Sequence, residues 1–459
     1  MPDDKTKGLE MFQLTFIFLA LLLLLILSYL SSYCSVILTP QFGFVSGFLL
    51  SVSFAFCWIK EWELSLCDET VYVLVFGNIL FVLVSFITQK IALRYKLVLG
   101  KKDYNHREKY SVAESKIQVE EWKLYLFLSL QCLILLITLY YLIFKIGGGL
   151  LGAIYIINSS SKKEEVSVGF PFVIRQLRNL SFASSFIWSY MLVHACINKY
   201  KNHTVLLAVN LLLSVLIYLL GGARQGLIQV IVAIVVYGYF IWGEGIKWGK
   251  RLRIETILKV IAVGLILILS YQNLGNLFGR NFNINSNDYI GAYLSAEIKN
   301  LDIFIRKGEF GQGNSFSTTQ TFAHITNQLA GRFGFPERAF KFDQPYNYIN
   351  GHYLGNVYTV FWAFLYDGGY IAFIVLTAFM AFILQLIYIR VMKNRSRINE
   401  EINVALIVYG YMYFECAFSF FTAWFFARTF NTSFLYYIIY WFLLKVYIEK
   451  VKLRKKKGT

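Results

Sequence analysis

Long apolar runs separated by short polar segments dominate the pattern of this chain. A run of about 18 or more apolar residues is long enough to cross a bilayer as a helix. The sequence predicts about 11 such spans, within a range of about 10–12. The expected spans are residues 11–35, 42–59, 70–88, 122–146, 170–197, 205–220, a seventh ending at Trp242, 257–271, 368–389, 402–426 and 433–448. We therefore expect an all-α polytopic membrane protein, with residues 1–459 forming a single integral membrane domain.

One polar segment, Leu274–Asp367, is much longer than the other connections. Loops longer than about 12–15 residues are usually functional or disordered, and this one is too rich in aromatic residues to be typical of disorder. Its last part, residues 357–365, could form a re-entrant half-span. We expect this loop to form the active site, with the apolar helices as its scaffold.

Two helices are expected inside the loop. Apolar residues recur at helical spacing over Ile290–Ile305, which predicts an amphipathic helix at the membrane interface. Asp302 and Arg306 stand at the i,i+4 pairing distance on its polar side. A second helix is expected over Ser317–Ala330, capped by its serine and ended by Gly331.

Composition strengthens the membrane assignment. Hydrophobic residues make up 57% of the chain, aromatic residues 18% and charged residues only 15%, and the mean hydropathy is +0.54. These values exclude a soluble protein of this length. The six cysteines lie mostly within apolar runs and show no metal-ligand spacing, so we expect no metal site.

The net charge of +17 sets the orientation. The basic residues gather in short segments between spans, around residues 90–109, 247–253, 393–397 and 445–457. This distribution follows the positive-inside rule, so these segments are expected in the cytoplasm, beside acidic membrane lipids. The long loop then falls on the outer face of the membrane. No nucleic-acid partner is expected.

Arginines at this outer face are the first candidates for chemistry. Arg224 follows two glycines between two apolar runs, and Arg280 leaves the eighth span at the same face. Together they could hold a diphosphate, since guanidinium groups donate forked hydrogen bonds to phosphate oxygens. The alternative for both is an anchor extended to the lipid head groups. Arg175 and Arg332 are weaker candidates, for which anchoring and loop packing are the plainer interpretations.

A base is the second requirement of a transfer reaction. His352 lies between glycine and aromatic residues where the loop re-enters the membrane, and histidine is the usual general base near neutral pH. His324 is the other loop histidine. Asp302 and Asp367 are candidate carboxylates, although an ion pair explains the first and a charge at a helix N-terminus the second.

Several short motifs resemble the bacterial O-antigen polymerases, which polymerise oligosaccharide repeat units. They span residues 221–226 (GGARQG), 293–294, 300–302, 355–359 (GNVYT) and 366–369 (YDGG). The resemblance covers most of the chain from the fourth span onward, in order and spacing. Arg280 and Gly291 also fit the Arg-x10-Gly pattern of outer loops in such polymerases.

The resemblance implies a glycosyltransferase of the GT-C-like fold class without metal or other cofactor. Its donor and acceptor would be undecaprenyl-diphosphate-linked oligosaccharides, and its partner a chain-length-regulating co-polymerase. The location would be the bacterial inner membrane, with the product an O-antigen or capsule. By similarity to the related O-antigen ligases, Arg224 and Arg280 would bind diphosphate and His352 would be the catalytic base.

Two other functions stay open at this point. An O-antigen ligase would use the same donor but another acceptor, the lipid A core. A flippase for lipid-linked oligosaccharides belongs to a different class, and transporters usually show internal repeats with broken helices at the membrane midplane. We find no such repeat, and the polar residues gather in one loop. Polymerisation is therefore the favoured function.

Overall fold

The computed structural model describes residues 4–31, 36–95, 117, 119–160, 169–197, 203–245, 286–334 and 344–449. Seven helices in these ranges are long and apolar enough to cross a membrane. They are α1 (Asp4–Ser31), α2 (Pro40–Ala55, extended by the 3-10 turn η2, Phe56–Trp58), α3 (Asp68–Arg94), α5 (Glu121–Tyr140, extended by the π-helical turn η4, Tyr141–Ile146), α7 (Phe172–Ile197), α9 (Gln225–Gly245) and α14 (Val360–Lys393). Three apolar helices are shorter: α8 (Thr204–Leu219), α15 (Val404–Ala417) and α17 (Thr432–Ile448). The fold is that of a multi-pass, all-α membrane protein.

These helices correspond to all the predicted spans except the eighth. The eighth span, residues 257–271, lies outside the described residues, so the total of about 11 remains a prediction. Side-chain caps set several of the helix starts. Thr39 accepts a hydrogen bond from the Phe42 amide before α2, and Asn403 accepts one from the Leu406 amide before α15.

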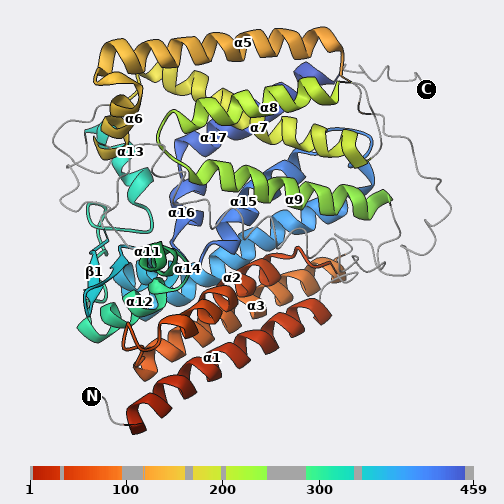
Figure 1. Cartoon of the computed structure of the whole chain (residues 1–459). Coiled ribbons are helices and arrows are strands. Elements are labelled where there is room, and N and C mark those ends of the chain that lie inside the picture. Colours follow the sequence, from red (N-terminus) through yellow and green to blue (C-terminus); the bar gives the residue numbers. More distant parts are fainter. Residues whose placement is uncertain are drawn as a thin grey trace.

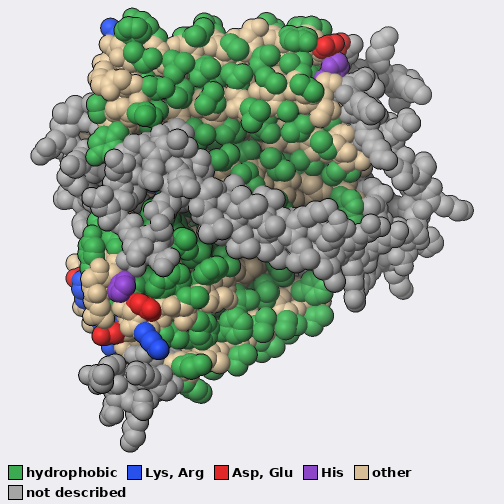
Figure 2. All heavy atoms as spheres, in the orientation of Figure 1, with side chains coloured by type: hydrophobic (Ala, Val, Ile, Leu, Met, Phe, Trp, Pro, Cys, Tyr) green, Lys and Arg blue, Asp and Glu red, His purple; other side chains and the backbone are tan. Residues whose placement is uncertain are grey.

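The helices form a bundle whose two ends differ (Figure 1). At one end lie α11 (Ser286–Leu294), α12 (Ala296–Lys307), α13 (Ala323–Phe333) and the hairpin of β1 (Asn347–Ile349) and β2 (His352–Gly355). The start of α1 reaches this same end, where Gln13 accepts a hydrogen bond from the Leu66 amide. Hydrophobic side chains cover the visible described helices between the ends, and charged side chains gather at the ends (Figure 2).

The opposite end holds basic residues in the last turn of α17, in the first turn of α5 and after α14. Lys445 pairs with Glu401 at 2.8 Å, and Lys123 Nζ donates to the Ile448 carbonyl at 3.3 Å. The short 3-10 turn η5 (Arg395–Arg397) lies here as well. The loop elements and these basic residues are therefore separated by the length of the bundle, as the predicted orientation requires.

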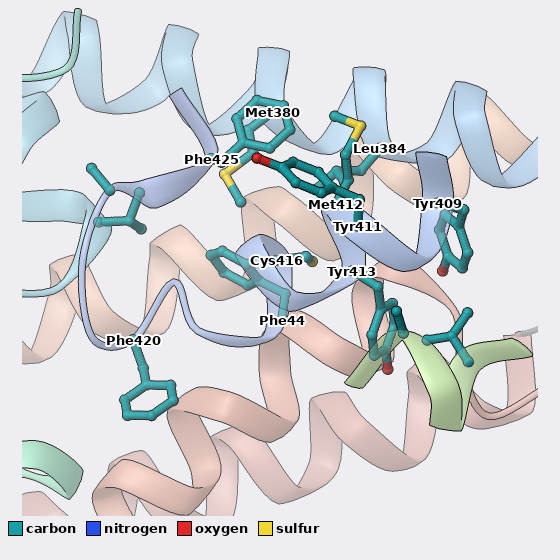
Figure 3. Close-up of a cluster of buried hydrophobic side chains, with 14 of the residues drawn as sticks. Phe44, Met380, Leu384, Tyr409, Tyr411, Met412, Tyr413, Cys416, Phe420 and Phe425 are labelled. Carbon is teal, nitrogen blue, oxygen red and sulfur yellow. The ribbon is translucent and has the colours of Figure 1, made fainter. Parts of the chain in front are cut away.

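Helix α15 is the centre of the core. Its residues from Tyr409 to Cys416 are all buried, among side chains of α2, α9 and α14 (Figure 3). Glycines allow this close approach on two sides. A Cβ atom on Gly47 would collide with the Ala417 carbonyl, and one on Gly410 would collide with the ring of Tyr237. A larger side chain at either position would push α15 away from α2 or α9.

Two boundaries differ from the expectation. Most of the half-span suggested at residues 357–365 is the first part of α14, which begins at Val360 and continues through a kink at Gly368 and Gly369. Gly369 has φ +60° and ψ −150°, a conformation that favours glycine. The predicted tenth span is divided, because the chain turns after α15 and restarts as α16 (Trp424–Thr429). The Ser419 carbonyl in that turn accepts a hydrogen bond from the Val360 amide at the start of α14.

A further helix lies between the fourth and the fifth predicted spans. Helix α6 (Gly149–Ser160) is apolar and packs against η4. Gly147 and Gly148, at φ +79° and +78°, separate the two helices. The helix ends at Ser160, within the polar run Ser159–Lys163.

The predicted loop helices are present with corrections. Helix α12 is buried on both sides, so it is not an interfacial helix with a polar face in water: Lys299 and Asp302 are buried, as is Ile298. The predicted Ser317–Ala330 helix begins six residues later, as α13, and ends at Gly334 instead of Gly331. Gly334 has the left-handed φ of +64° that ends many helices.

Candidate active site

Arg224 occupies the turn between α8 and α9. Its carbonyl accepts the Leu227 amide, so the residue lies at the N-terminus of α9. Only 3% of Arg224 is exposed, and its Nη2 donates to the hydroxyl of Tyr289 in α11 at 3.2 Å. This burial is not that of an anchor extended to lipid head groups. A guanidinium beside the positive end of a helix dipole makes a local site for an anion.

Arg178 supports this turn from α7. Its Nη2 lies 3.3 Å from the carbonyls of Ile217 and Tyr218 at the end of α8. The guanidinium stacks on the ring of Phe170, 3.8 Å from the centroid. Gly221 makes room, since a Cβ atom there would collide with Arg178 Nη2. Arg178 therefore caps α8 and holds the backbone that carries Arg224.

A third arginine, Arg428 of α16, is largely covered and meets α9 about one helical turn beyond Arg224. Its Nη1 is 3.3 Å from Gln229 Oε1 and 3.2 Å from Glu415 Oε1. Gln229 Nε2 also donates to Glu415 Oε1 at 2.8 Å. The Arg428 guanidinium lies over the ring of Trp424, 4.5 Å from its centroid. This cluster joins α9, α15 and α16 close to the turn that bears Arg224.

This cluster was not predicted, although the sequence contained a signal for it. Glu415 is the one charged residue within the predicted tenth span, residues 402–426. Ionisable residues inside spans are rare and usually paired or functional. Glu415 Oε2 and Arg428 Nη2 are both buried and have no hydrogen-bond partner in the described structure. The pair therefore retains unused acceptor and donor capacity at the centre of the bundle.

His352 lies at the start of β2, paired with Ile349 of β1. Asn350 and Gly351, at φ +51° and +81°, form the two-residue turn that joins the strands. Both positive φ angles are those of a type I′ turn, for which Asn-Gly is the preferred sequence. His352 is half-buried, and its strand packs against α11, the helix whose Tyr289 holds Arg224. Arg224 and the strand that carries His352 therefore both contact α11.

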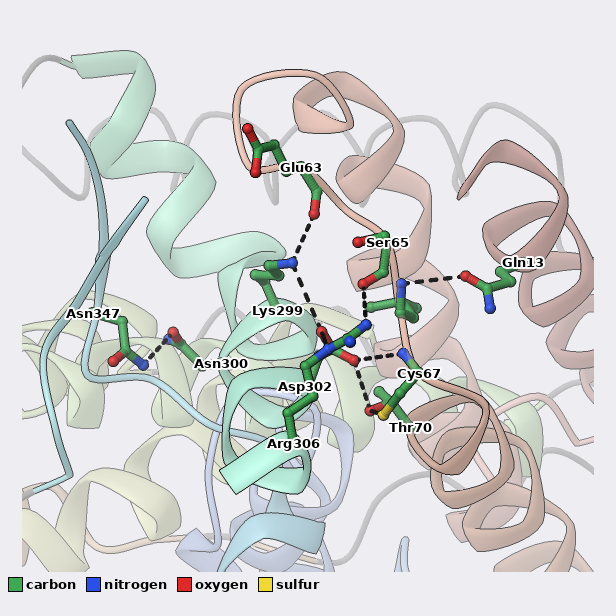
Figure 4. Close-up of polar contacts among 11 residues, drawn as sticks. Gln13, Glu63, Ser65, Cys67, Thr70, Lys299, Asn300, Asp302, Arg306 and Asn347 are labelled. Carbon is green, nitrogen blue, oxygen red and sulfur yellow. Dashed lines mark hydrogen bonds and ion pairs between the residues drawn. The ribbon is translucent and has the colours of Figure 1, made fainter. Parts of the chain in front are cut away.

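The hairpin is fixed to α12 by amide side chains. Asn300 Nδ2 donates to the carbonyls of Leu354 and Val357, at 3.3 Å and 2.7 Å. Asn347 Nδ2 donates to Asn300 Oδ1 at 2.9 Å (Figure 4). Asn347 also donates to the Tyr358 hydroxyl at 2.9 Å. Asn300 is fully buried, so these contacts hold the strand of His352 in a defined place.

Asp302 has a structural set of partners. Its carboxylate accepts hydrogen bonds from the Cys67 amide at 2.7 Å and Thr70 Oγ1 at 3.0 Å, and pairs with Arg306 Nε at 2.8 Å (Figure 4). The predicted i,i+4 pair with Arg306 is confirmed. The carboxylate joins α12 to the N-terminus of α3 and is fully buried. These contacts account for the buried carboxylate of Asp302 as a structural group, so no role as a base is needed to explain it.

Asp367 has a comparable set in another place. Its oxygens accept hydrogen bonds from Thr319 Oγ1 at 2.6 Å and from the amides of Gln320 and Thr321 at 2.7 Å and 2.9 Å. The predicted charge at a helix N-terminus is wrong in this respect, because the carboxylate binds a turn distant in sequence. The Asp367 carboxylate thus holds the segment that precedes α13 against the kink of α14.

The other sequence candidates lie apart. His324 and Arg332 are exposed on α13, and Arg175 is exposed in the first turn of α7, 5.8 Å from the ring centroid of Phe172. Arg280 lies outside the described residues. Gly291 has a packing role, since a Cβ atom there would collide with Trp58 and Trp62. Of the predicted site residues that the structure describes, Arg224 and His352 are the ones that α11 connects.

Within the described residues, no group of three or more His, Cys, Asp or Glu side chains could hold a metal ion. Comparisons of the chain with protein-family models, curated proteins and solved structures found no match. The functional assignment therefore depends on the residues and their arrangement.

Proposed function

We propose that this protein polymerises lipid-linked oligosaccharide repeat units of a surface polysaccharide, an O-antigen or a capsule. The growing glycan would pass from undecaprenyl diphosphate to an incoming lipid-linked unit at the outer face of the bacterial inner membrane. The observation that supports this most is the buried Arg224 at the N-terminus of α9, covered by the loop helix α11. The sequence motifs shared with O-antigen polymerases support it as well.

The reaction would need little beyond these residues. The acceptor hydroxyl attacks C1 of the donor sugar while the bond from C1 to the diphosphate oxygen breaks. The electron pair leaves with the diphosphate, whose charge Arg224 and Arg280 would stabilise. The hydroxyl proton passes to the imidazole of His352. The diphosphate is a good leaving group, so the proposal includes no metal or other cofactor.

The scaffold suits a lipid substrate. The outward sides of α1, α3 and α5 carry exposed large hydrophobic residues, as expected for lipid contact. A polyprenyl chain attached to the diphosphate could remain among such side chains while its sugar lies against the outer loop. A GT-C-like arrangement and a chain-length-regulating co-polymerase belong to the same proposal.

Deletion of the gene, followed by electrophoresis of the surface glycan, tests the function. A single repeat unit on the lipid A core supports a polymerase. Free polymer without attachment to the core would instead show a ligase, and absence of both would show a flippase or an earlier step. Complementation with Arg224→Ala should fail, whereas Arg397→Ala, an exposed arginine at the opposite end of the bundle, should restore polymer.

Sidedness needs its own measurement. A cysteine at Asn314, which is exposed in the long loop, should react with an impermeant thiol reagent in intact spheroplasts. A cysteine at Arg397 should react only after the membrane is opened. The reverse result would place the loop in the cytoplasm and end the proposal.

A further inference from the structure

A chain of tyrosine rings leads outward from Arg224. Tyr289 is 3% exposed and contacts Arg224 through its hydroxyl. Tyr293 lies one turn along α11, with its ring centroid 4.7 Å from that of Tyr289. Tyr293 also stacks on Phe421, with centroids 5.5 Å apart and 13° between the ring planes. The inner rings are therefore held on a rigid support.

The hairpin continues this chain. Helix α11, which carries Tyr293, packs against β2, which carries Tyr353. The ring of Tyr353 is 6.2 Å from Tyr346 and 5.4 Å from Tyr348, between centroids. Tyr346 is 50% exposed and Tyr348 65% exposed. Exposure thus rises from the buried arginine to the surface of the hairpin.

We propose that Tyr289, Tyr293, Tyr353, Tyr346 and Tyr348 form a binding path for the oligosaccharide part of the substrate. This inference rests on the proposed function and deepens it, because it places the glycan relative to the diphosphate. The diphosphate end would lie at Arg224, and the sugars would extend over α11 and the hairpin.

The chemistry of the path fits a neutral, polyhydroxylated ligand. Each tyrosine offers an apolar ring face for the C–H side of a sugar and a hydroxyl that donates or accepts a hydrogen bond. Burial, followed by the neighbouring phenols, raises the pKa of Tyr353, so its hydroxyl keeps its proton. None of the five side chains is charged at neutral pH, and at the inner end of the path Tyr289 contacts the guanidinium of Arg224.

Other tyrosines of the same loop show what a purely structural role looks like. Tyr358 is 3% exposed; its hydroxyl accepts a hydrogen bond from Asn347 and donates one to the Pro345 carbonyl. Tyr346 and Tyr348 instead present half or more of their surface at the end of the bundle that carries the loop elements. Truncating the two exposed rings should therefore cost little stability, which makes them suitable for a test.

The test combines binding with kinetics. The probe is the lipid-free oligosaccharide that mild acid releases from the lipid fraction of the host cells. Purified protein in detergent should show saturation-transfer NMR signals from this probe. Tyr346→Leu and Tyr348→Leu should each weaken binding by about 2–10-fold, the effect of losing one aromatic contact of about 0.5–1.5 kcal/mol. Tyr348→Phe, which keeps the ring, should retain most of the affinity.

The matched control is Tyr72→Leu, a 71% exposed tyrosine in the first turns of α3. It should bind the probe like the wild type. In polymerisation assays the path variants should raise KM for the lipid-linked unit and leave kcat unchanged. No binding by the wild type, or equal weakening in Tyr72→Leu, would overturn the path. If the protein binds the probe through these tyrosines but has no polymerase activity, the proposed function is refuted and the binding path is not.

Discussion

Ser51 and Glu297 join the bundle to the outer loop. The Ser51 hydroxyl of α2 donates to Glu297 Oε1 of α12 at 2.5 Å, and both residues are fully buried. Glu297 Oε2 is also buried and has no hydrogen-bond partner in the described structure. Burial raises the pKa of the Glu297 carboxyl to about 8. The residue that secures α12 is therefore protonated at neutral pH.

This carboxyl predicts a pH dependence of loop stability. Its pKa is higher in the folded than in the unfolded protein, so between about pH 4.5 and pH 8 the folded state holds one more proton. The contribution is largest below about pH 4.5, falls as the pH rises through this window, and is constant above about pH 8. Hydrogen exchange of α12 amides should accelerate with pH beyond the intrinsic rate. Glu297→Gln should remove that excess, and an unchanged excess would contradict the assignment.

The pair of Arg428 and Glu415 allows a test by stability. We expect a large loss of stability when one partner is replaced and a smaller loss when both are replaced. Arg428→Met leaves Glu415 buried and unpaired, and breaking such a pair typically costs about 3–5 kcal/mol. The double variant Arg428→Met with Glu415→Leu removes both charges and should recover much of this loss. Thermal unfolding in detergent measures it.

The exposed pair Arg397–Glu401 supplies the control, since Arg397→Met should cost at most about 1 kcal/mol. Activity then separates structure from function. A stable double variant with wild-type polymerisation would mean that Arg428 only holds α16 in place. A stable but inactive one would add Arg428 to the diphosphate site.

Replacement of Asp367 should open part of the outer loop. Asp367→Ala leaves the Thr319 hydroxyl and two backbone amides without their acceptor, and each lost charge-assisted contact costs about 1.5–3 kcal/mol. Limited proteolysis should then cleave among the exposed residues 314–315. Asp302→Ala, which removes the other carboxylate contact, should open residues 63–70 and leave 314–315 protected. Cleavage at the same place in both variants would mean that the loop opens as one unit.

The apolar pattern predicted the scaffold well because its signal is local. Runs of lipid-facing residues are long, and α2, α3, α7 and α17 begin within two residues of the expected positions. The hairpin also carried a local signal that was not used for prediction, the pair Asn350-Gly351 between tyrosine-rich segments.

The loop was harder to predict because its partners are distant in sequence. The polar side of α12 was expected to face water, yet Asp302 is covered by Cys67 and Thr70, more than 230 positions earlier. Arg428 and Gln229 likewise meet only after α16 folds back onto α9. Periodicity identifies which side of a helix is polar, but it does not say whether that side meets water or a buried partner.

Arg224 and His352 give the most direct test of the proposed chemistry. Arg224→Lys should not restore activity, because an ammonium cannot reproduce the forked geometry of a guanidinium toward phosphate oxygens. The loss of a charge-assisted contact costs about 1.5–3 kcal/mol, roughly ten- to a hundred-fold in rate. His352→Ala should leave donor binding nearly intact and slow transfer by about 10²–10⁴-fold, the usual contribution of a general base.

A structural role predicts another pattern for the same variants. If Arg224 and His352 only stabilise the loop, their variants will lower the amount of protein in the membrane while the activity of each molecule stays unchanged. Polymerisation must therefore be measured per folded protein, with exposed Arg332→Lys and His324→Ala as matched controls. Wild-type specific activity in Arg224→Lys and His352→Ala would remove both residues from the mechanism. An inactive His324→Ala beside an active His352→Ala would move the base to α13 and leave the diphosphate site at α9 unchanged.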